Sequence, residues 1–315
     1  MILGSISILL IVSLSGMILM SVPSASHIQG SNVSSNLTGM TSNTSRIATS
    51  NSNVIIISDD QELKTKLLAK DLEDTLRDGV SALELISNNT TPMTNPPDIA
   101  LLKSTIKTLH GIPQNADEPK RKLVQDVLSK YKIFQYVGYQ TPTGDLYFTE
   151  PYSHQVAIHT LNFAFREHYK GAVASRGPYL SNVITNVVTG KPNAIVAIPI
   201  YSQNDGGNKS LIGLLTASLN FTYFDQSLRS LTVTNNVQRI VLVDHNGTAI
   251  VDSSSSGNNK YVPKESFASL QSFKNAIAGK SGSIVESVNG TKMLVSYHPV
   301  KAVQRTWAVL LMKTL

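Results

Sequence analysis

Three side chains that could contact a ligand or a substrate lie close together in this sequence: Arg166, His168 and Tyr169 fall within four positions. A guanidinium is a planar fork of N–H donors that matches a carboxylate two-to-two. The segment therefore suits a catalytic loop, a phosphate cradle or the wall of a binding pocket. Simpler alternatives remain open, because Arg166 could form an exposed ion pair with Glu167. His168 could be a hydrogen-bonded structural histidine, and Tyr169 a core aromatic with one polar end.

The nearby segment "VTGKP" has the residue types of a phosphate loop but not its pattern. It lacks the glycine spacing of a P-loop, and Pro192 removes a donor where a cradle needs backbone N–H groups. We interpret it as a turn in which Gly190 has a positive φ and Lys191 is exposed.

Other catalytic and metal-binding patterns do not fit. His154, His159 and His168 form a histidine cluster, but their spacing matches no zinc motif and no cysteine is present to complete a site. The stretch "DHNG" at Asp244 lacks the later acidic ligands of a calcium loop. There is no G-x-S-x-G nucleophile elbow. The sequence therefore predicts no enzyme, no metal site and no cofactor.

Composition limits the partners further. The 315 residues are 41% hydrophobic and 15% charged, which favours a folded chain over a disordered one. The net charge is +6, but the basic residues are scattered and aromatics make up 6%, so we expect no nucleic-acid partner. The absence of cysteine excludes disulfides, thiolate metal sites and cysteine nucleophiles.

The N-terminus predicts export. Residues 2–22 carry no charged side chain over a length that can span a bilayer as a helix. Small residues at 24–26 resemble a signal-peptidase site, so residues 1–26 are either a transmembrane anchor or a cleaved signal peptide. The long apolar run without a basic start favours the uncleaved anchor. We expect a cell-membrane protein with an extracytoplasmic domain, or a secreted protein if the signal is cleaved.

The next segment, residues 27–53, is rich in Ser, Thr and Asn and predicts a flexible stalk. Dense Asn-x-Ser/Thr sequons after an export signal predict a glycosylated surface; they lie at Asn32, Asn36, Asn43, Asn88, Asn89, Asn208, Asn246 and Asn289. Asn220 also matches the pattern, but it lies in an apolar run and we do not expect it to be modified.

Helical patterns extend through residues 54–132. Steps of four, four, four and three residues predict one amphipathic helix through Leu68, Leu72, Leu76, Val80 and Leu83. Prolines and asparagines in "NNTTPMTNPPD" interrupt it. Two further helices follow in "IALLKSTIKTLHGI" and "PKRKLVQDVLSKY".

After Tyr131 the pattern changes to strands and short turns. A hairpin, a helix (162–174 in the first copy, "ESFASLQSFKNAIAG" in the second) and two or three strands occur twice in tandem, over residues 133–232 and 233–315. Short turns join antiparallel strands, whereas parallel strands need long crossovers. The sequence therefore predicts an α+β fold: a long N-terminal helix followed by two tandem PAS-like antiparallel-sheet modules.

This order of elements, with "FREHYKGAVA", "YLSNVITNVVTGKPNAIVAIPIY", "LIGLLTASLNF", "RIVLVDHNGTAIVDS" and "MLVSYHPVKAVQRTWAVLL", resembles the double Cache domain. That family comprises extracytoplasmic ligand-sensing modules of chemoreceptors, sensor kinases and related membrane proteins. The resemblance covers residues 54–315. It implies that 133–232 is a membrane-distal module that holds the ligand and 233–315 a membrane-proximal module that does not.

The resemblance also implies a binding site. Arg166 stands at the family's carboxylate-binding arginine, His168 where a tryptophan is usual, and Tyr169 at the following aromatic. Ser218 replaces the aspartate that binds a ligand amine, and Leu161 replaces a tyrosine. The ligand-binding residues expected on this basis are Arg166, His168, Tyr169, Tyr179, Asn182, Tyr201 and Ser218. Without the aspartate, we expect a small polar or carboxylate-bearing ligand that lacks an amine.

These observations predict a membrane-anchored small-molecule sensor. Because "TWAVLLMKTL" is too short to span a bilayer, we expect no output domain in this chain and signalling through a partner protein or a homodimer. The alternative is a glycosylated structural or adhesive surface protein of the same fold without a small ligand.

Overall fold

The computed structural model describes residues 46–50, 53–57, 59–186, 192–202, 209–234, 239–254 and 265–315. They belong to one compact unit, Thr44–Leu315. The predicted anchor or signal at residues 1–26 lies outside the described residues, and so does the predicted turn at Gly190 and Lys191. In the described part of the chain, no helix combines the length and the apolar character needed to cross a membrane.

The first described element differs from the prediction. Strands β1 (Arg46–Ser50) and β2 (Asn53–Ile57) form an antiparallel hairpin, with Arg46 opposite Ile57. The prediction of a flexible stalk up to residue 53 and a helical region from residue 54 is wrong for these residues, because they form strands. The run of β-branched residues over 54–57 favours extended backbone, which explains the strand.

The predicted long helix is confirmed as α1 (Asp59–Asn89). Its five periodic residues, Leu68 to Leu83, are all buried. Three shorter helices follow: α2 (Thr91–Thr94), α3 (Ile99–Leu109) and α4 (Glu118–Lys130). The Asp98 carboxylate caps α3 by accepting from the Leu101 N–H at 2.9 Å.

The first module contains a five-stranded antiparallel sheet in the order β4-β3-β9-β8-β5. Its elements are β3 (Phe134–Gln140), β4 (Leu146–Glu150), α5 (Tyr152–Ala157), α6 (Glu167–Ser175), β5 (Tyr179–Leu180), β6 (Ile184–Thr185), β7 (Pro192–Asn193), β8 (Ile195–Tyr201) and β9 (Leu211–Leu219). β6 and β7 pair separately with each other.

The second module repeats this topology. Its sheet has the order β11-β10-β14-β13-β12, so each strand has a counterpart in the first module. The elements are α7 (Phe221–Thr234), β10 (Arg239–Val243), β11 (Ala249–Asp252), α8 (Gln271–Ile277), β12 (Gly282–Val288), β13 (Thr291–Ala302) and β14 (Arg305–Thr314). The predicted α+β fold with two tandem antiparallel sheets is confirmed.

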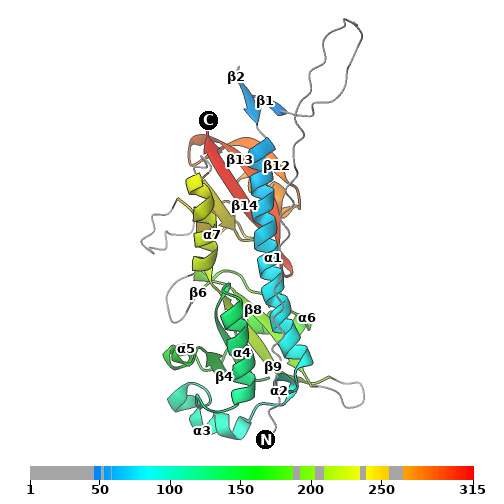
Figure 1. Cartoon of the computed structure of the whole chain (residues 1–315), viewed down its shortest axis with the longest axis vertical. Coiled ribbons are helices and arrows are strands. Elements are labelled where there is room, and N and C mark those ends of the chain that lie inside the picture. The colour runs from blue at the N-terminus through cyan, green and yellow to red at the C-terminus, as the bar shows by residue number, and fades with distance from the viewer. Residues whose placement is uncertain are drawn as a thin grey trace, which may run out of the picture. The chain divides into compact units, whose positions relative to one another are not determined.

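Helix α1 joins the two modules, since it packs against β8 of the first sheet and β13 and β14 of the second (Figure 1). Its leucines share one hydrophobic core with the inner faces of both sheets. The opposite face of each sheet carries a short helix: α6 packs on β8 and β5, and α8 on β13 and β14. We call these outer surfaces the α6 face and the α8 face.

Both short helices begin later than predicted, at Glu167 and Gln271. The preceding residues bind to the hairpin turn instead, through Phe163 N–H to Gly144 in the first module and Phe267 N–H to Gly247 in the second, each at 2.7 Å. Both glycines have φ +85°, a conformation that other residues rarely adopt. The helix can start only after the chain leaves this turn.

Candidate ligand-binding site

The α6 face of the first sheet combines polar residues with a small apolar cluster of Ala172, Ala197 and Leu214. Strand register places Tyr136 opposite Ser218, Gly138 opposite Thr216 and Gln140 opposite Leu214, all on this face. Successive residues of a strand point to opposite sides of the sheet, so the apolar neighbours of these residues face α1 and the shared core. Gly138 lies between the hydroxyls of Thr149 and Thr216.

Tyr136 is the centre of a hydrogen-bond network on this face. Its hydroxyl accepts from the side-chain amides of Asn193 at 3.1 Å and Asn186 at 3.3 Å. The Ser218 hydroxyl donates to Asn193 Oδ1 at 2.8 Å. Burial raises the pKa of Tyr136, and the positive charge of Arg166 acts in the opposite direction.

His154 of α5 covers the Tyr136 ring. The two rings are stacked, with centroids 3.8 Å apart. Burial lowers the pKa of His154 to about 4, so its imidazole is neutral at pH 7. Both side chains are only half-buried. They can therefore offer an aromatic surface and neutral hydrogen-bonding atoms to a small molecule.

Arg166 occupies the N-cap position of α6, where its own side chain does not cap the helix. The half-buried guanidinium lies 4.9 Å from the centroid of the Phe165 ring. No carboxylate in the described ranges lies within ion-pair distance of it, and the Glu167 carboxylate pairs instead with Arg305. The ion pair with Glu167 considered from the sequence is thus not formed.

The first turn of α6 adds to the positive potential at Arg166. No described side chain accepts a hydrogen bond from the N–H groups of residues 167–169. Such free N–H groups and the helix dipole favour an anion at this end of a helix. The backbone and the guanidinium therefore attract the same kind of partner.

Two buried polar atoms in this region have no hydrogen-bond partner among the described residues. One is Nε2 of His168, whose side chain is 4% exposed, and the other is Oε1 of Gln140. Burial, and secondarily the charge of Arg166, lower the pKa of His168 to about 4. A buried polar atom without a partner costs about 1–3 kcal/mol.

The other residues predicted for the site have different roles. Tyr169 donates its hydroxyl to the Pro142 carbonyl. The Tyr179 hydroxyl donates to Glu167 at 2.9 Å, and the Asn182 N–H donates to the same carboxylate at 3.0 Å. Tyr201 is the last residue of β8, whereas Ser218 lies opposite Ile195, the first residue of β8. Tyr201 and Ser218 are therefore separated by the length of the strand, about 20 Å.

The structure thus places Ser218 in the Tyr136 network, on which Arg166 acts through its charge, whereas Tyr179 and Asn182 bind Glu167. Sequence reasoning missed Tyr136, His154 and the polar residues around them. A signal was present in "FQYVGYQ", where polar or small residues alternate with apolar ones at the period of a strand. The matching strand "RIVLV" of the second module is apolar on both sides after its first residue.

The register identifies the equivalent positions in the second module. Val241, Val243, Leu310 and Met312 stand where the first module has Gly138, Gln140, Thr216 and Ser218. These four residues belong to the hydrophobic cluster beneath α8. The α8 face is therefore a closed apolar core.

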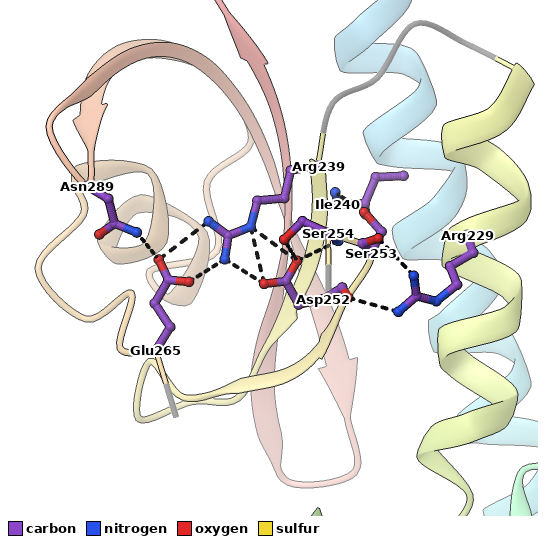
Figure 2. A network of polar contacts seen from close by, with 8 residues as sticks. All are labelled: Arg229, Arg239, Ile240, Asp252, Ser253, Ser254, Glu265 and Asn289. Carbon is purple, nitrogen blue, oxygen red and sulfur yellow. Dashed lines mark hydrogen bonds and ion pairs between the residues drawn. The ribbon is translucent and has the colours of Figure 1, made fainter. Parts of the chain in front are cut away.

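Arg239 is the counterpart of Tyr136, and it is fully engaged. Figure 2 shows its guanidinium between the carboxylates of Asp252 and Glu265, with Asn289 donating to Glu265 at 2.6 Å. Burial disfavours the charged form of Arg239 and lowers its pKa, but the hydrogen bonds to Asp252 and Glu265 outweigh this effect and raise the pKa overall. Arg229 of α7 extends the network by donating to the Ser253 carbonyl at 3.0 Å.

The first turn of α8 is also satisfied internally. Glu286 of β12 accepts from the N–H groups of Gln271 at 2.8 Å and Ser272 at 3.3 Å. Leu270 occupies the N-cap position that Arg166 has in α6. A carboxylate therefore accepts from the first N–H groups of α8, whereas the Glu167 carboxylate in the first turn of α6 accepts from Arg305, Tyr179 and Asn182 instead.

A metal site has no basis in the residues that the structure describes, because no group of three or more His, Asp or Glu side chains is arranged to hold an ion. The arrangement on the α6 face offers hydrogen bonds, one arginine charge and neutral imidazoles, which suit binding of a small polar molecule.

Comparison with known families identifies the domain. The sequence model of the Cache domain family (dCache_1) matches residues 24–314. The chain therefore belongs to the Cache domain family. The match begins upstream of residue 54 and includes the segment expected to be a stalk. The comparison with curated proteins returns no match.

Solved structures share the fold at low sequence identity. An extracellular ligand-binding receptor from Desulfohalobium retbaense has 14% identity and a TM-score of 0.56, over 84% of this chain and 42% of the receptor chain. The ligand-binding domain of the Pseudomonas aeruginosa chemoreceptor PctC, in complex with GABA, has 18% identity and a TM-score of 0.54, over 81% and 99% of the two chains. That of Pseudomonas fluorescens CtaA with L-serine has 16% identity and a TM-score of 0.52, over 81% and 96%. This chain thus spans less than half of the Desulfohalobium receptor.

Proposed function

We propose that this chain is an extracytoplasmic sensor domain that binds a small carboxylate-bearing molecule at the α6 face of its first module. The guanidinium of Arg166 and the free N–H groups at the start of α6 would hold the carboxylate. Tyr136, His154 and the amides of Asn186 and Asn193 would contact the remainder of the molecule.

The contrast between the two modules carries this proposal. At equivalent positions the second module has a hydrophobic core, an arginine held by two carboxylates and a helix end capped by Glu286. The first module has polar residues and an arginine without such a partner in the described ranges. Buried polar atoms without a partner do not separate the modules, because the second module has them too, at His245 and Ser272. Since the fold is stable with the face closed, the polar version indicates a binding role.

The charge of the site favours a ligand without an ammonium group. Ser218 lies where the family places an aspartate, and its hydroxyl already donates to Asn193. Glu167, the carboxylate nearest in sequence to Arg166, is bound by Arg305 and Tyr179. The relatives PctC and CtaA were solved with GABA and L-serine, which carry an amine as well as a carboxylate. We propose that this chain discriminates against such amines.

A ligand panel tests the proposal. Thermal unfolding and calorimetric titration of the full chain in detergent would use acetate, L-lactate, succinate, L-serine, GABA and ethylamine. We expect stabilisation by one or more of the amine-free acids and none by ethylamine. Arg166→Gln should reduce the affinity for the best acid about 10- to 100-fold, as expected for a lost charge-assisted hydrogen-bond pair. Arg176→Gln, at the exposed other end of α6, is the matched control.

Stabilisation by ethylamine alone, or equal effects of the two arginine substitutions, would contradict the proposal. A chain that binds no member of the panel would favour the alternative of a structural or adhesive surface protein. We further propose that residues 1–26 anchor the domain to the membrane, and that it signals through a partner protein or a homodimer rather than by catalysis. Protease protection of the intact protein in membrane vesicles tests the anchor.

A further inference from the structure

The turn between β13 and β14 of the second module reaches the first module. Gln304 in this turn forms two hydrogen bonds with the backbone of Leu180: its amide donates to the Leu180 carbonyl at 2.9 Å, and its carbonyl accepts from the Leu180 N–H at 2.9 Å. Asn246, in the neighbouring β10–β11 turn, donates to Asn182 Oδ1 at 3.2 Å. Two turns of one module thus hold the β5 segment of the other.

Arg305 is the charged centre of this contact. Its Nε donates to the Leu180 carbonyl at 2.8 Å, and its Nη2 donates to Glu167 at 2.6 Å and to the Tyr179 hydroxyl at 3.0 Å. Its Nη1 contacts Nε2 of His245. The side chain is only 16% exposed, so the pair with Glu167 is partly shielded from solvent and stronger than an exposed one.

Glu167 connects this contact to the ligand site. It is the first residue of α6 and follows Arg166 directly. Both of its carboxylate oxygens are used: one accepts from Arg305 and Tyr179, and the other accepts from the Asn182 N–H at 3.0 Å. The turn of helix that presents Arg166 is therefore tied to a side chain of the second module.

We propose that Arg305 is a positioning residue for the ligand site: it holds the first turn of α6, so that ligand occupancy at Arg166 and the contact between the modules are energetically coupled. The part concerning occupancy rests on the proposed function above. Coupling of this kind is reciprocal, because a contact that improves binding must itself be strengthened by binding. It gives ligand binding in the first module a direct effect on the second.

The positioning is tested without any ligand. Hydrogen–deuterium exchange of the full chain would compare wild type, Arg305→Gln and the control Lys301→Gln, which alters an exposed residue of the same hairpin. We expect exchange of the amides at 167–171 and 179–182 to rise at least about fivefold in Arg305→Gln and to stay unchanged in the control. Unchanged exchange in Arg305→Gln would overturn the proposal. If Arg305→Gln does not fold, Glu167→Gln and Tyr179→Phe remove the same contacts one at a time and replace it.

The coupling is tested with the amine-free acid that binds wild type most tightly in the panel above. Arg305→Gln should weaken its binding about 5- to 20-fold, within the usual range of coupling between sites. Glu167→Gln should cause a smaller loss in Arg305→Gln than in wild type, since the pair between Arg305 and Glu167 is already absent there. Faster exchange with unchanged affinity would overturn the coupling. If no acid binds wild type, the proposed function and the coupling both fail, whereas the positioning is still decided by exchange alone.

Discussion

The α6 face and the α8 face are two versions of one architecture. Both lie on a five-stranded sheet of the same strand order, and both are covered by a short helix that starts after a glycine turn. The α8 face buries valine, leucine and methionine, whereas the α6 face has glycine, glutamine, threonine and serine at the matching positions. The second module thus uses the surface for stability, whereas the first gives up apolar burial at these positions and keeps a smaller buried cluster of Ala172, Ala197 and Leu214 between α6 and the sheet.

The cost of the polar face can be judged from single positions. Burying a leucine side chain contributes about 1.5–3 kcal/mol, which Thr216 does not provide in place of Leu310. The unsatisfied atoms of His168 and Gln140 add a further penalty, part of which the α8 face shares through the unsatisfied hydroxyl of Ser272. Under the proposed function, the binding energy of a ligand at this surface would offset that cost.

The largest expected difference between the faces is in side-chain truncation. Leu310→Ala should lower the free energy of unfolding by about 2–5 kcal/mol, because it opens a cavity in a closed core. Thr216→Ala, at the matching position, should cost about 1 kcal/mol or less, since its hydroxyl makes only a long hydrogen bond of 3.4 Å to the Gly138 carbonyl. Urea unfolding of the full chain measures both, and equal losses would break the comparison.

The next largest difference is expected between Arg239 and Arg166, in the stability that each substitution costs. Arg239→Gln should cost about 1.5–3 kcal/mol, because it leaves Asp252 and Glu265 without their cation. Arg166→Gln should change stability by less than about 0.5 kcal/mol in the absence of ligand. Thermal melts at low and high salt report both values, with Arg239→Lys as an intermediate control. A large ligand-free loss for Arg166→Gln would show that this arginine has a structural role.

The third difference is in the response to pH. His168 has a folded pKa of about 4, below its unfolded value of about 6.5, so the unfolded chain binds a proton that the folded chain does not between these values. Stability should therefore fall by about 1.4 kcal/mol per pH unit for this histidine as pH drops from 6.5 to 4. His154 acts in the same direction.

Unfolding titrations across this window would test the effect. His168→Gln should reduce the slope by the contribution of one proton, whereas Ser272→Ala, at the matching position of α8, should leave it unchanged. If His168→Gln keeps the wild-type slope, the imidazole is not held neutral in the folded protein, and the electrostatic description of the α6 face is wrong.

The smallest expected effect concerns the helix ends. Glu286→Gln keeps the shape of the side chain that accepts from Gln271 and Ser272 but removes its charge. It should cost about 0.3–1 kcal/mol, the usual value of a charge at a helix N-terminus. By the same principle, the carboxylate of an acid bound at the start of α6 should stabilise that helix end as Glu286 stabilises the start of α8. If Glu286→Gln has no effect in thermal melts at low salt, the comparison between the N-termini of α6 and α8 fails.

Much of the fold could be predicted from local patterns. The four-residue spacing of leucines in α1 and the short turns between strands determine helix and sheet directly, because a helix and a strand expose different periodicities. The β1–β2 hairpin was missed, since a polar composition suggested a spacer and the β-branched run at 54–57 was read as part of the helical region. The helices α6 and α8 were predicted too long because hydrogen bonds to distant glycine turns set their starts.

The site could be predicted only in part. Residue type and spacing, and then the family resemblance, nominated Arg166 as a ligand-binding residue, which stays a prediction. The alternative ion pair with Glu167 is excluded only by the structure, in which Arg305, 138 positions away, binds that carboxylate. Tyr179 and Asn182 lie near Arg166 in sequence, but their hydrogen bonds belong to the contact between the modules. The role of each of these residues depends on a hydrogen-bond partner far away in the sequence, which no local sequence pattern reveals.

By itself, the sequence determined the class of fold, the tandem repeat and the presence of a cation at the start of one short helix, because propensity and periodicity act over a few residues. The tertiary structure decided which surface stays polar and which is filled. It also decided that Glu167 serves the second module and leaves Arg166 available. Strand register and contacts between the modules produce these outcomes, and both arise only when distant segments pack together.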